Sequence, residues 1–378
     1  MSHQNQLNQT TNQRPARRQG ITFLLTSALF ALCCFSSLQI NAQTNRSGAQ
    51  NRGTNEVRHP LVEALDKDDP RAQLNPELRN ATAMPNAMQF PGAQSEDGQE
   101  PRMVEFNMQT GRETSSKGHV TTESLPDELR LAPVTGYQGP GAKPDQGDRE
   151  AEKASRNGAA QIESCGDNSQ ANYNVGAYPM SAQVKIFMTF PNGGTYQGSG
   201  VMIGSKYVLT AMNNVYYSAF GGLATRIEVI PGLNGYYKPF GSAYASYIRY
   251  YYDGYSKVGL LTLDRHIGNS TGWLGYGSYS DSYLSSRWGH QFSYPTDRDY
   301  GRVLYYNNGN IANLNRDWLS VGVTYNSGEM GAGMYFLDYY GSRYVFGVSQ
   351  GTWNCGTWGS RLTDWITGQL RYVITYGL

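Results

Sequence analysis

The 378-residue chain is almost neutral, with 31 Lys and Arg against 30 Asp and Glu and a formal net charge of +1. Such a balance lacks the excess of positive charge that binds nucleic acid or another polyanion, so we expect no partner of that class. Aromatic residues are unevenly spread: all six tryptophans, and every tyrosine except Tyr137, follow residue 165. Because aromatic side chains build cores, we expect the folded domain in this second part of the chain.

Residues 1–42 have the pattern of a secretory signal. A basic stretch (Arg14, Arg17, Arg18) precedes an apolar run over residues 21–38, and Asn41-Ala42 ends it with a small residue at a plausible cleavage point. We therefore predict a signal peptide over residues 1–42 and a secreted or periplasmic protein without membrane attachment after cleavage. A retained membrane anchor is the alternative.

Residues 43–164 are polar, poor in aromatics and without a sustained period of 2 or 3.6. This composition predicts a disordered or weakly structured segment. Two interpretations stay open: a pro-segment, or a flexible spacer in front of the domain.

Residues 165–378 consist of short apolar or alternating runs separated by Gly, Asn, Asp and Ser, the pattern of a β-barrel or sandwich. The predicted strands cover residues 183–190, 198–203, 207–211, 226–230, 258–263, 302–306, 319–323, 335–338 and 344–348. The last segment changes period, because Leu362, Trp365, Ile366, Leu370 and Val373 recur at helical spacing. A terminal amphipathic helix capped by Thr363 or Asp364 is expected.

Several motifs resemble trypsin-like serine peptidases, especially the secreted glutamyl-endopeptidase branch. The longest is GSGVMIGSKYVLTAMNNV over residues 198–215, which matches the strands that lead to the catalytic histidine of that family. Shorter matches follow in the family's order, ending with YVFGV at 344–348 and GSRLT at 359–363. The resemblance covers residues 165–378 and implies an all-β fold: two six-stranded antiparallel β-barrels of the trypsin-like serine peptidase type with a C-terminal helix. A monomer is expected.

The same resemblance locates three catalytic positions, and all three are substituted. The family's histidine falls on Asn213, its aspartate on Lys257 and its nucleophilic serine on Met330, within NSGEMGAGM. An amide cannot accept a proton near neutral pH, a cation opposes an imidazolium, and a thioether cannot be acylated. We therefore expect a peptidase scaffold without peptidase chemistry.

The positions around the triad also carry over. The backbone N–H groups of Gly328 and Met330 correspond to the family's oxyanion hole. Tyr325 and Ser349 correspond to the specificity pocket, where Tyr325 would fill space and Ser349 brings no positive charge. A preference for acidic substrates is therefore not expected.

Two function classes remain open. The first is a secreted, catalytically inactive serine peptidase homologue that acts as a protein- or peptide-binding module through an unknown ligand. The second is an active trypsin-like endopeptidase with a mislocated triad, in which Ser327 would be the nucleophile. Asn213 would still leave that enzyme without a base, and neither His266 nor His290 follows a catalytic motif.

The remaining features predict one cross-link and no cofactor. After signal cleavage the chain keeps only Cys165 and Cys355. In a secreted protein of this fold they are expected to form a disulfide. No Cys, His or Asp cluster has metal-ligand spacing, so neither a metal nor a cofactor is predicted. The tyrosine-rich run 247–255 is interpreted as half-buried strand surface, with a recognition face as the alternative.

Overall fold

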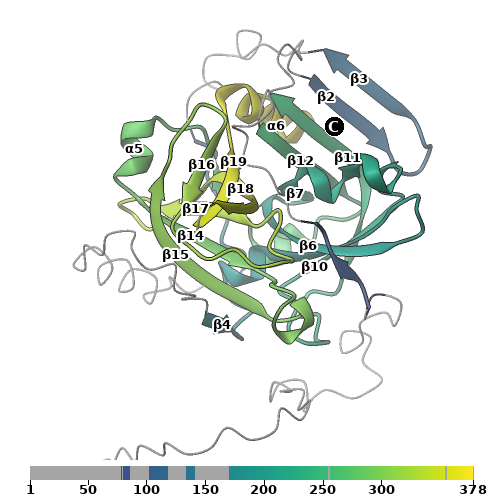
Figure 1. Cartoon of the computed structure of the whole chain (residues 1–378), viewed down its shortest axis with the longest axis horizontal. Coiled ribbons are helices and arrows are strands. Elements are labelled where there is room, and N and C mark those ends of the chain that lie inside the picture. Colours follow the sequence, from purple (N-terminus) through teal and green to yellow (C-terminus); the bar gives the residue numbers. More distant parts are fainter. Residues whose placement is uncertain are drawn as a thin grey trace, which may run out of the picture. The chain divides into compact units, whose positions relative to one another are not determined.

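Two β-barrels form the body of the domain (Figure 1). The computed structural model describes residues 78, 80–85, 102–117, 133–140, 170–253, 256–353 and 356–377, all within the unit Asn55–Leu378. The predicted signal peptide (1–42) and both cysteines of the predicted disulfide, Cys165 and Cys355, lie outside the described residues.

The first barrel contains the glycine-rich strands of the longest motif. Its strands are β5 (Gln183–Thr189), β6 (Thr195–Gly204), β7 (Tyr207–Ala211), β10 (Arg226–Pro231), β11 (Ala243–Asp253) and β12 (Ser256–Leu263). They pair in the order β10-β5-β6-β7-β12-β11, and antiparallel pairing of β10 with β11 closes the barrel. Gly200 faces Ile186 and the Leu209 carbonyl so closely that an added Cβ would lie 2.8 Å and 3.0 Å from them. A side chain at that position would not fit.

The second barrel follows in the chain and has the same number of strands. These are β14 (Trp288–Ser293), β15 (Leu304–Ala312), β16 (Trp318–Val321), β17 (Gly333–Leu337), β18 (Arg343–Trp353) and β19 (Gly356–Arg361). The order is β18-β17-β14-β15-β16-β19, and β18 pairs with β19 to close it. Two closed six-stranded antiparallel barrels confirm the predicted fold class.

Short elements complete the connections. They are β4 (Gln170–Asn172), β8 (Tyr216–Tyr217), β9 (Gly222–Leu223), β13 (Gly275–Tyr276), α4 (Gly268–Thr271), α5 (Asp281–Ser285) and the 3-10 turns η4 (Met180–Ala182), η5 (Met212–Asn214), η6 (Ser218–Phe220) and η7 (Asp299–Gly301). Of these, η5 matters for the site because it follows β7 directly.

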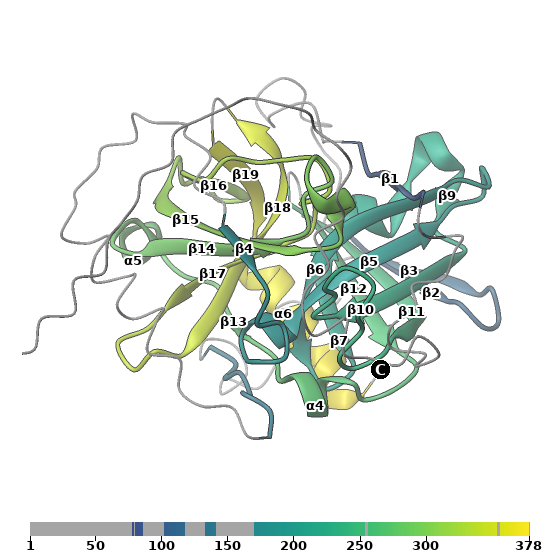
Figure 2. The ribbon, with the colours of Figure 1, turned by 90° about the horizontal axis from the view of Figure 1, so that it is seen from below.

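The C-terminal helix α6 (Asp364–Tyr376) returns to the first barrel, beside β11 and β12 (Figures 1 and 2). The Thr363 hydroxyl caps it by accepting a bond from the Ile366 N–H at 3.3 Å, as the sequence predicted. The Trp365 ring packs edge-on to Tyr251 of β11, with centroids 6.2 Å apart. The described part of the chain contains no helix of the length and hydrophobicity that a membrane crossing needs.

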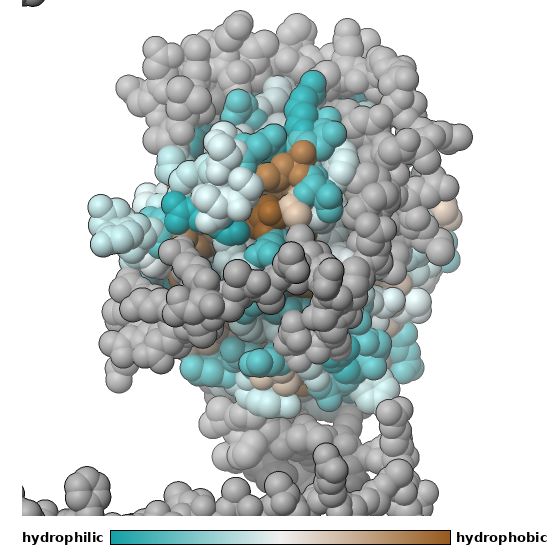
Figure 3. All heavy atoms as spheres, turned by 60° about the vertical axis from the view of Figure 1, so that its left-hand side comes forward, coloured by the Kyte–Doolittle hydropathy of each residue, from teal (hydrophilic) through white to brown (hydrophobic). Residues whose placement is uncertain are grey.

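The core has two parts. The larger cluster fills the first barrel and continues through Tyr335, Val345 and Val348 of the second barrel to Leu370 of α6. The smaller one, around Val321, Phe336 and Phe346, fills the second barrel. On the face that Figure 3 shows, the described residues are mostly hydrophilic and surround one small apolar strip.

Residues 43–164, for which the composition predicted a disordered or weakly structured segment, contain some regular structure. Three strands lie there: β1 (Thr82–Ala83), β2 (Arg102–Asn107) and β3 (Glu113–Lys117). β1 adds to β6 in parallel, and the hairpin β2-β3 adds to β11. The partners of β1 and β2 in the barrel lie more than 100 residues away in the sequence, so no local period predicts these strands. The pro-segment and spacer interpretations stay predictions.

Candidate active-site region

The turn between β16 and β17 contains Met330, which the resemblance aligns with the family's nucleophile. Gly328 and Gly331 have φ values of +92° and +87°, in the left-handed region that glycine adopts without strain. The Gly331 N–H donates to the Ser349 carbonyl at 2.8 Å, and the Ala332 N–H donates to the Glu329 carbonyl at 3.0 Å. The glycines of the motif therefore hold a tight bend, as the resemblance implied.

Asn214 joins this turn to the first barrel. Its side chain is fully buried, and its Nδ2 donates to the Met330 carbonyl at 2.9 Å, to Thr210 Oγ1 at 2.8 Å and to the Ser199 carbonyl at 3.3 Å. The Ser199 N–H also donates to the Met330 carbonyl, at 2.9 Å. β6, η5 and the turn thus meet at one point between the barrels.

The side chain of Met330 is completely buried. Its carbonyl is held by Ser199 and Asn214, whereas its N–H and that of Gly328 donate to no described residue. These are the two N–H groups that the sequence assigned to the oxyanion hole. The turn therefore retains two unengaged donors beside a side chain that cannot act as a nucleophile.

Asn213 and Lys257, which the resemblance aligns with the other two triad positions, lie on two neighbouring elements of the first barrel. Asn213 belongs to η5, directly before Asn214, and is half-buried with no side-chain hydrogen bond to a described residue. Lys257 directly precedes Val258, which pairs with Ala211 just before η5. Its side chain is exposed and forms no ion pair with a described residue. Only its backbone is fixed, because its N–H donates to Ser360 Oγ at 2.9 Å and its carbonyl accepts from Gln350 Nε2 at 2.6 Å.

The two residues that the resemblance aligns with the family's specificity pocket are both buried. The Tyr325 side chain is 6% exposed, and that of Ser349 is fully buried. The Ser349 hydroxyl donates to the Glu329 carbonyl at 2.6 Å. The Tyr325 hydroxyl is buried and hydrogen-bonds to no described residue, and burial together with nearby Glu329 holds the pKa of this phenol well above its usual range. These side chains fill space instead of presenting groups to a ligand.

Glu329 is the residue that the sequence interpretation missed. It lies between Gly328 and Met330 and is 1% exposed. Its carboxylate accepts bonds from Ser293 Oγ at 2.9 Å and from the Asn326 N–H at 3.0 Å. No cation pairs with it among the described residues, and burial raises the pKa of Glu329 from 4.5 to about 7. The sequence signal that could have pointed to Glu329 is a charged residue inside a turn of small residues.

The described histidines are engaged elsewhere. His290 lies on β14, stacked between Tyr306 and Tyr335, and its Nδ1 is 2.6 Å from the Tyr306 hydroxyl. Burial lowers the pKa of His290 to about 3, so it is neutral at ordinary pH. His266 is exposed and contacts Ser205 Oγ at 2.9 Å, in the turn that joins β6 to β7. Neither ring hydrogen-bonds to the nucleophile turn.

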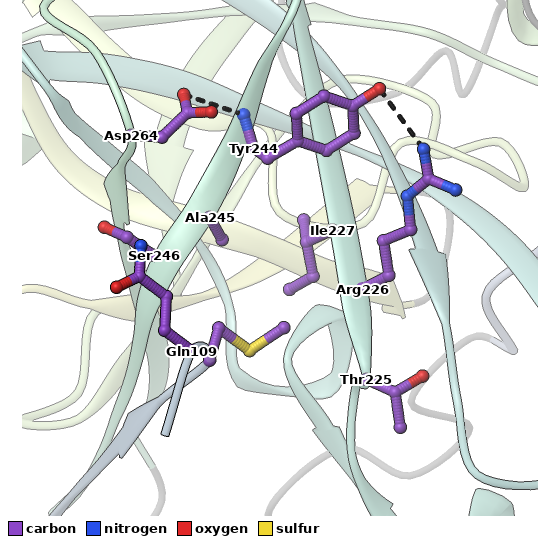
Figure 4. Close-up of a pocket in the computed structure, with 9 residues that line it drawn as sticks. Gln109, Thr225, Arg226, Ile227, Tyr244, Ala245, Ser246 and Asp264 are labelled. Carbon is purple, nitrogen blue, oxygen red and sulfur yellow. Dashed lines mark hydrogen bonds between the residues drawn. The ribbon is translucent and has the colours of Figure 1, made fainter. Parts of the chain in front are cut away.

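A cavity of about 300 Å³ lies on the first barrel, between β10, β11 and the end of β2 (Figure 4). The Arg226 guanidinium donates to the Tyr244 hydroxyl at 3.2 Å, and the Asp264 carboxylate accepts from the Tyr244 N–H at 3.1 Å. None of the residues predicted for the site lines it. Within the described residues, no group of three or more His, Cys, Asp or Glu is placed to hold a metal ion.

Two closed six-stranded antiparallel barrels with a C-terminal helix are the architecture of the trypsin-like serine peptidases. Two curated bacterial proteases resemble the chain in sequence. The extracellular metalloprotease of Bacillus subtilis (strain 168) is 28% identical over 135 residues, which cover 34% of this chain and 42% of that protein. The glutamyl endopeptidase of Bacillus licheniformis is 33% identical over 139 residues, covering 34% of this chain and 40% of that protein.

The chain thus spans about two fifths of the length of these relatives. Among solved structures, a Glu endopeptidase in complex with MPD matches 56% of this chain and 98% of its own, with 19% identity and a TM-score of 0.47. The protease Anisep from Arthrobacter nicotinovorans matches 55% of this chain and 99% of its own, with 16% identity and a TM-score of 0.45. No protein-family model matches the chain.

Proposed function

We propose that this chain is a secreted, catalytically inactive homologue of trypsin-like serine peptidases that acts as a protein- or peptide-binding module. The observation that carries the proposal is the completely buried side chain of Met330 at the nucleophile position. Its backbone is fixed by two hydrogen bonds from the first barrel. Met330 is therefore part of the packing and not a variable surface residue.

The two other substitutions remove the remaining chemistry. General-base catalysis needs a group that takes the proton from the nucleophile and later returns it to the leaving group. Asn213 has no such nitrogen, and Lys257 adds a positive charge where the family uses an aspartate to stabilise an imidazolium. With all three roles vacant, only binding and the turn donors remain to influence a peptide bond.

Ser327 is the one serine of the turn and carries the alternative function. It is exposed, and its carbonyl accepts bonds from the Thr296 N–H at 2.6 Å and from Thr296 Oγ1 at 2.9 Å. Its hydroxyl is bonded to no described residue, and no described histidine contacts it. A serine without a base has the reactivity of any surface hydroxyl, which is why we favour the inactive module.

Binding would use the outside of the turn. Met330, Tyr325 and Ser349 fill the interior, whereas Gly328 and Met330 keep N–H groups that a ligand carbonyl can accept from. Ser327 is the exposed residue next to these donors. Secretion is supported by the sequence pattern of residues 1–42 and by the similarity to an extracellular metalloprotease of B. subtilis.

The test is a peptide array probed with the purified full chain, in parallel with a fluorogenic peptide library for turnover. Wild type should bind a subset of peptides and hydrolyse none. A Ser327→Arg variant should lose the bound subset, because the long cation blocks the turn. Tyr339→Arg is the matched control, since Tyr339 is 89% exposed in the turn at the far end of β17 and should bind as wild type does.

Two outcomes would contradict the proposal. Turnover that is abolished by Ser327→Ala would establish the active endopeptidase instead. Binding that is equal in wild type, Ser327→Arg and Tyr339→Arg would place the ligand site away from the turn.

A further inference from the structure

The hairpin β2-β3 is bound to the domain along a full strand. Residues Arg102–Asn107 pair with Tyr252–Tyr247 of β11 in antiparallel register without interruption. The Met108 N–H extends the ladder by donating to the Ser246 carbonyl at 2.9 Å. The outer edge of β11, which a closed barrel alone would leave open at these residues, is thereby covered.

A buried ion pair lies at the centre of this junction. Arg249 of β11 is 1% exposed and stands directly opposite Glu105 of β2. Its Nε and Nη2 both lie 2.5 Å from Glu105 Oε2, and its Nη1 donates to Thr262 Oγ1 at 2.7 Å. Glu105 supplies the carboxylate of this pair, and its side chain keeps 29% of its surface exposed.

Apolar contacts flank the ion pair on the neighbouring positions. Val104 is 3% exposed and faces Tyr250, which is 6% exposed. Met103 and Phe106 pack against the core cluster of the first barrel. The hairpin therefore contributes to the core as well as to the edge of the sheet.

We infer that the outer edge of β11 is a strand-addition site for a strand with a carboxylate opposite Arg249, and that residues 102–107 fill it permanently. A chain cut between residues 117 and 170 would keep its N-terminal fragment. The reason is the state that release would leave behind: a guanidinium built into the barrel without its counter-charge, and a strand edge without hydrogen-bond partners. The retention of the N-terminal fragment does not depend on whether the domain is an enzyme.

The pairing of the hairpin with β11 distinguishes two possible fates of the N-terminal segment, removal and retention. A pro-segment that is removed on activation must leave its binding site, whereas this hairpin is a structural part of the mature domain. Tyr250, Tyr251 and Tyr252 of β11 are all buried, so they cannot serve as a recognition face while the hairpin is in place.

The test introduces a site-specific protease sequence into the full chain within residues 118–132, which lie outside the described residues. The chain is cut under native conditions and analysed by gel filtration, with mass spectrometry of each peak. We expect the fragment that contains β2 and β3 to elute with the domain and to separate only in denaturant. Separate elution under native conditions would overturn the inference.

Two charge variants test the role of the ion pair. In Glu105→Lys, the cut fragment should elute apart from the domain, because two cations would then oppose each other at the junction. Glu113→Lys is the matched control on β3, where the residue is exposed and opposite Phe106, and it should retain the fragment. Retention in both variants would contradict the ion pair as the element that holds the hairpin.

A milder substitution covers the case in which Glu105→Lys does not fold. Glu105→Gln keeps the shape of the side chain and removes its charge. On serial dilution of the cut chain, its fragment should dissociate at a concentration at least about tenfold higher than that of wild type. Equal dissociation would again contradict the ion pair.

Discussion

Two adjacent asparagines differ in their surroundings: Asn214 holds the turn of Met330 to the first barrel, and Asn213 is the residue that the resemblance aligns with the catalytic histidine. Asn214 is fully buried and donates three hydrogen bonds, to β6, β7 and the nucleophile turn. Asn213 is half-buried and its side chain bonds to no described residue. The side chain of Asn214 thus joins the two barrels, whereas the side chain of its neighbour Asn213 joins no described elements.

Gly331, whose turn packs against the first barrel, and Asn214, which holds that turn to the barrel, support the fold itself, so replacing them costs stability. The side chains of Asn213 and Lys257 bond to no described residue, so replacing either should cost little. Met330 differs from these two, because its side chain is completely buried. Substitutions in the two groups should therefore differ in their effect on the free energy of unfolding.

The largest effect is expected for Gly331→Ala. The residue has a φ of +87°, and an added Cβ would lie 2.5 Å from the Ser199 carbonyl oxygen and 2.6 Å from Asn214 Nδ2. Strain and overlap together should lower the free energy of unfolding by about 4 kcal/mol or more. Gly235→Ala is a control for backbone strain alone, because its φ is +63° and its added Cβ meets no atom within 4 Å. Chemical denaturation of both variants checks this, and equal losses would show that the packing around Gly331 is loose.

The second effect depends on pH. The pKa of Glu329 rises from 4.5 to about 7 on folding, so the folded state keeps its proton at pH values where the unfolded state has lost it. Stability should therefore fall as the pH rises through this window, by about 3 kcal/mol in total. Glu329→Gln removes the titrating group, and the difference in unfolding free energy between the two proteins should follow the same window. A difference that does not change with pH would contradict the assignment.

The third prediction compares the two asparagines directly. Asn214→Ala removes a buried amide that bonds to two buried carbonyls and a hydroxyl, and should cost about 2 kcal/mol of unfolding free energy. Asn213→Ala should change it by less than about 0.5 kcal/mol. Urea denaturation measures both. Similar losses of unfolding free energy in the two variants would contradict the difference in structural role between Asn214 and Asn213.

The smallest effect is expected for Lys257. Its side chain is exposed and pairs with no described acid, so Lys257→Ala should leave the stability within about 0.5 kcal/mol of wild type. The backbone bonds to Ser360 and Gln350 do not involve the side chain and should persist. Thermal unfolding checks this, and a large loss would mean that the ammonium group has a structural partner.

Much of the fold could be predicted from local patterns. The strand Tyr207–Ala211 and the Thr363 cap of α6 are as expected, because alternation and capping are local signals. The strand Gly356–Arg361 was missed, since its glycines obscure the alternating pattern. Arg102–Asn107 was missed because its partner strand, β11, lies far away in the sequence.

At the site, the resemblance to the family indicated which residues occupy the aligned positions, but not how their side chains are buried or hydrogen-bonded. It assigned Asn213, Lys257 and Met330; in the structure η5 contacts the turn of Met330 through Asn214, and Lys257 precedes the residue that pairs with the end of β7. Tyr325, which was expected to fill space, is buried, and so is Ser349. The raised pKa of Glu329 could not be predicted either, because it follows from the removal of water around a turn.

The most direct test of the proposal that the site is inactive is labelling of the purified full chain with a fluorophosphonate, followed by peptide mapping. An activated serine reacts covalently with this reagent, whereas an ordinary surface hydroxyl does not. The account predicts no labelled serine in wild type, and none in Asn213→His or Met330→Ser alone, because catalytic groups act as a unit. Stoichiometric labelling of Ser327 in wild type would contradict it.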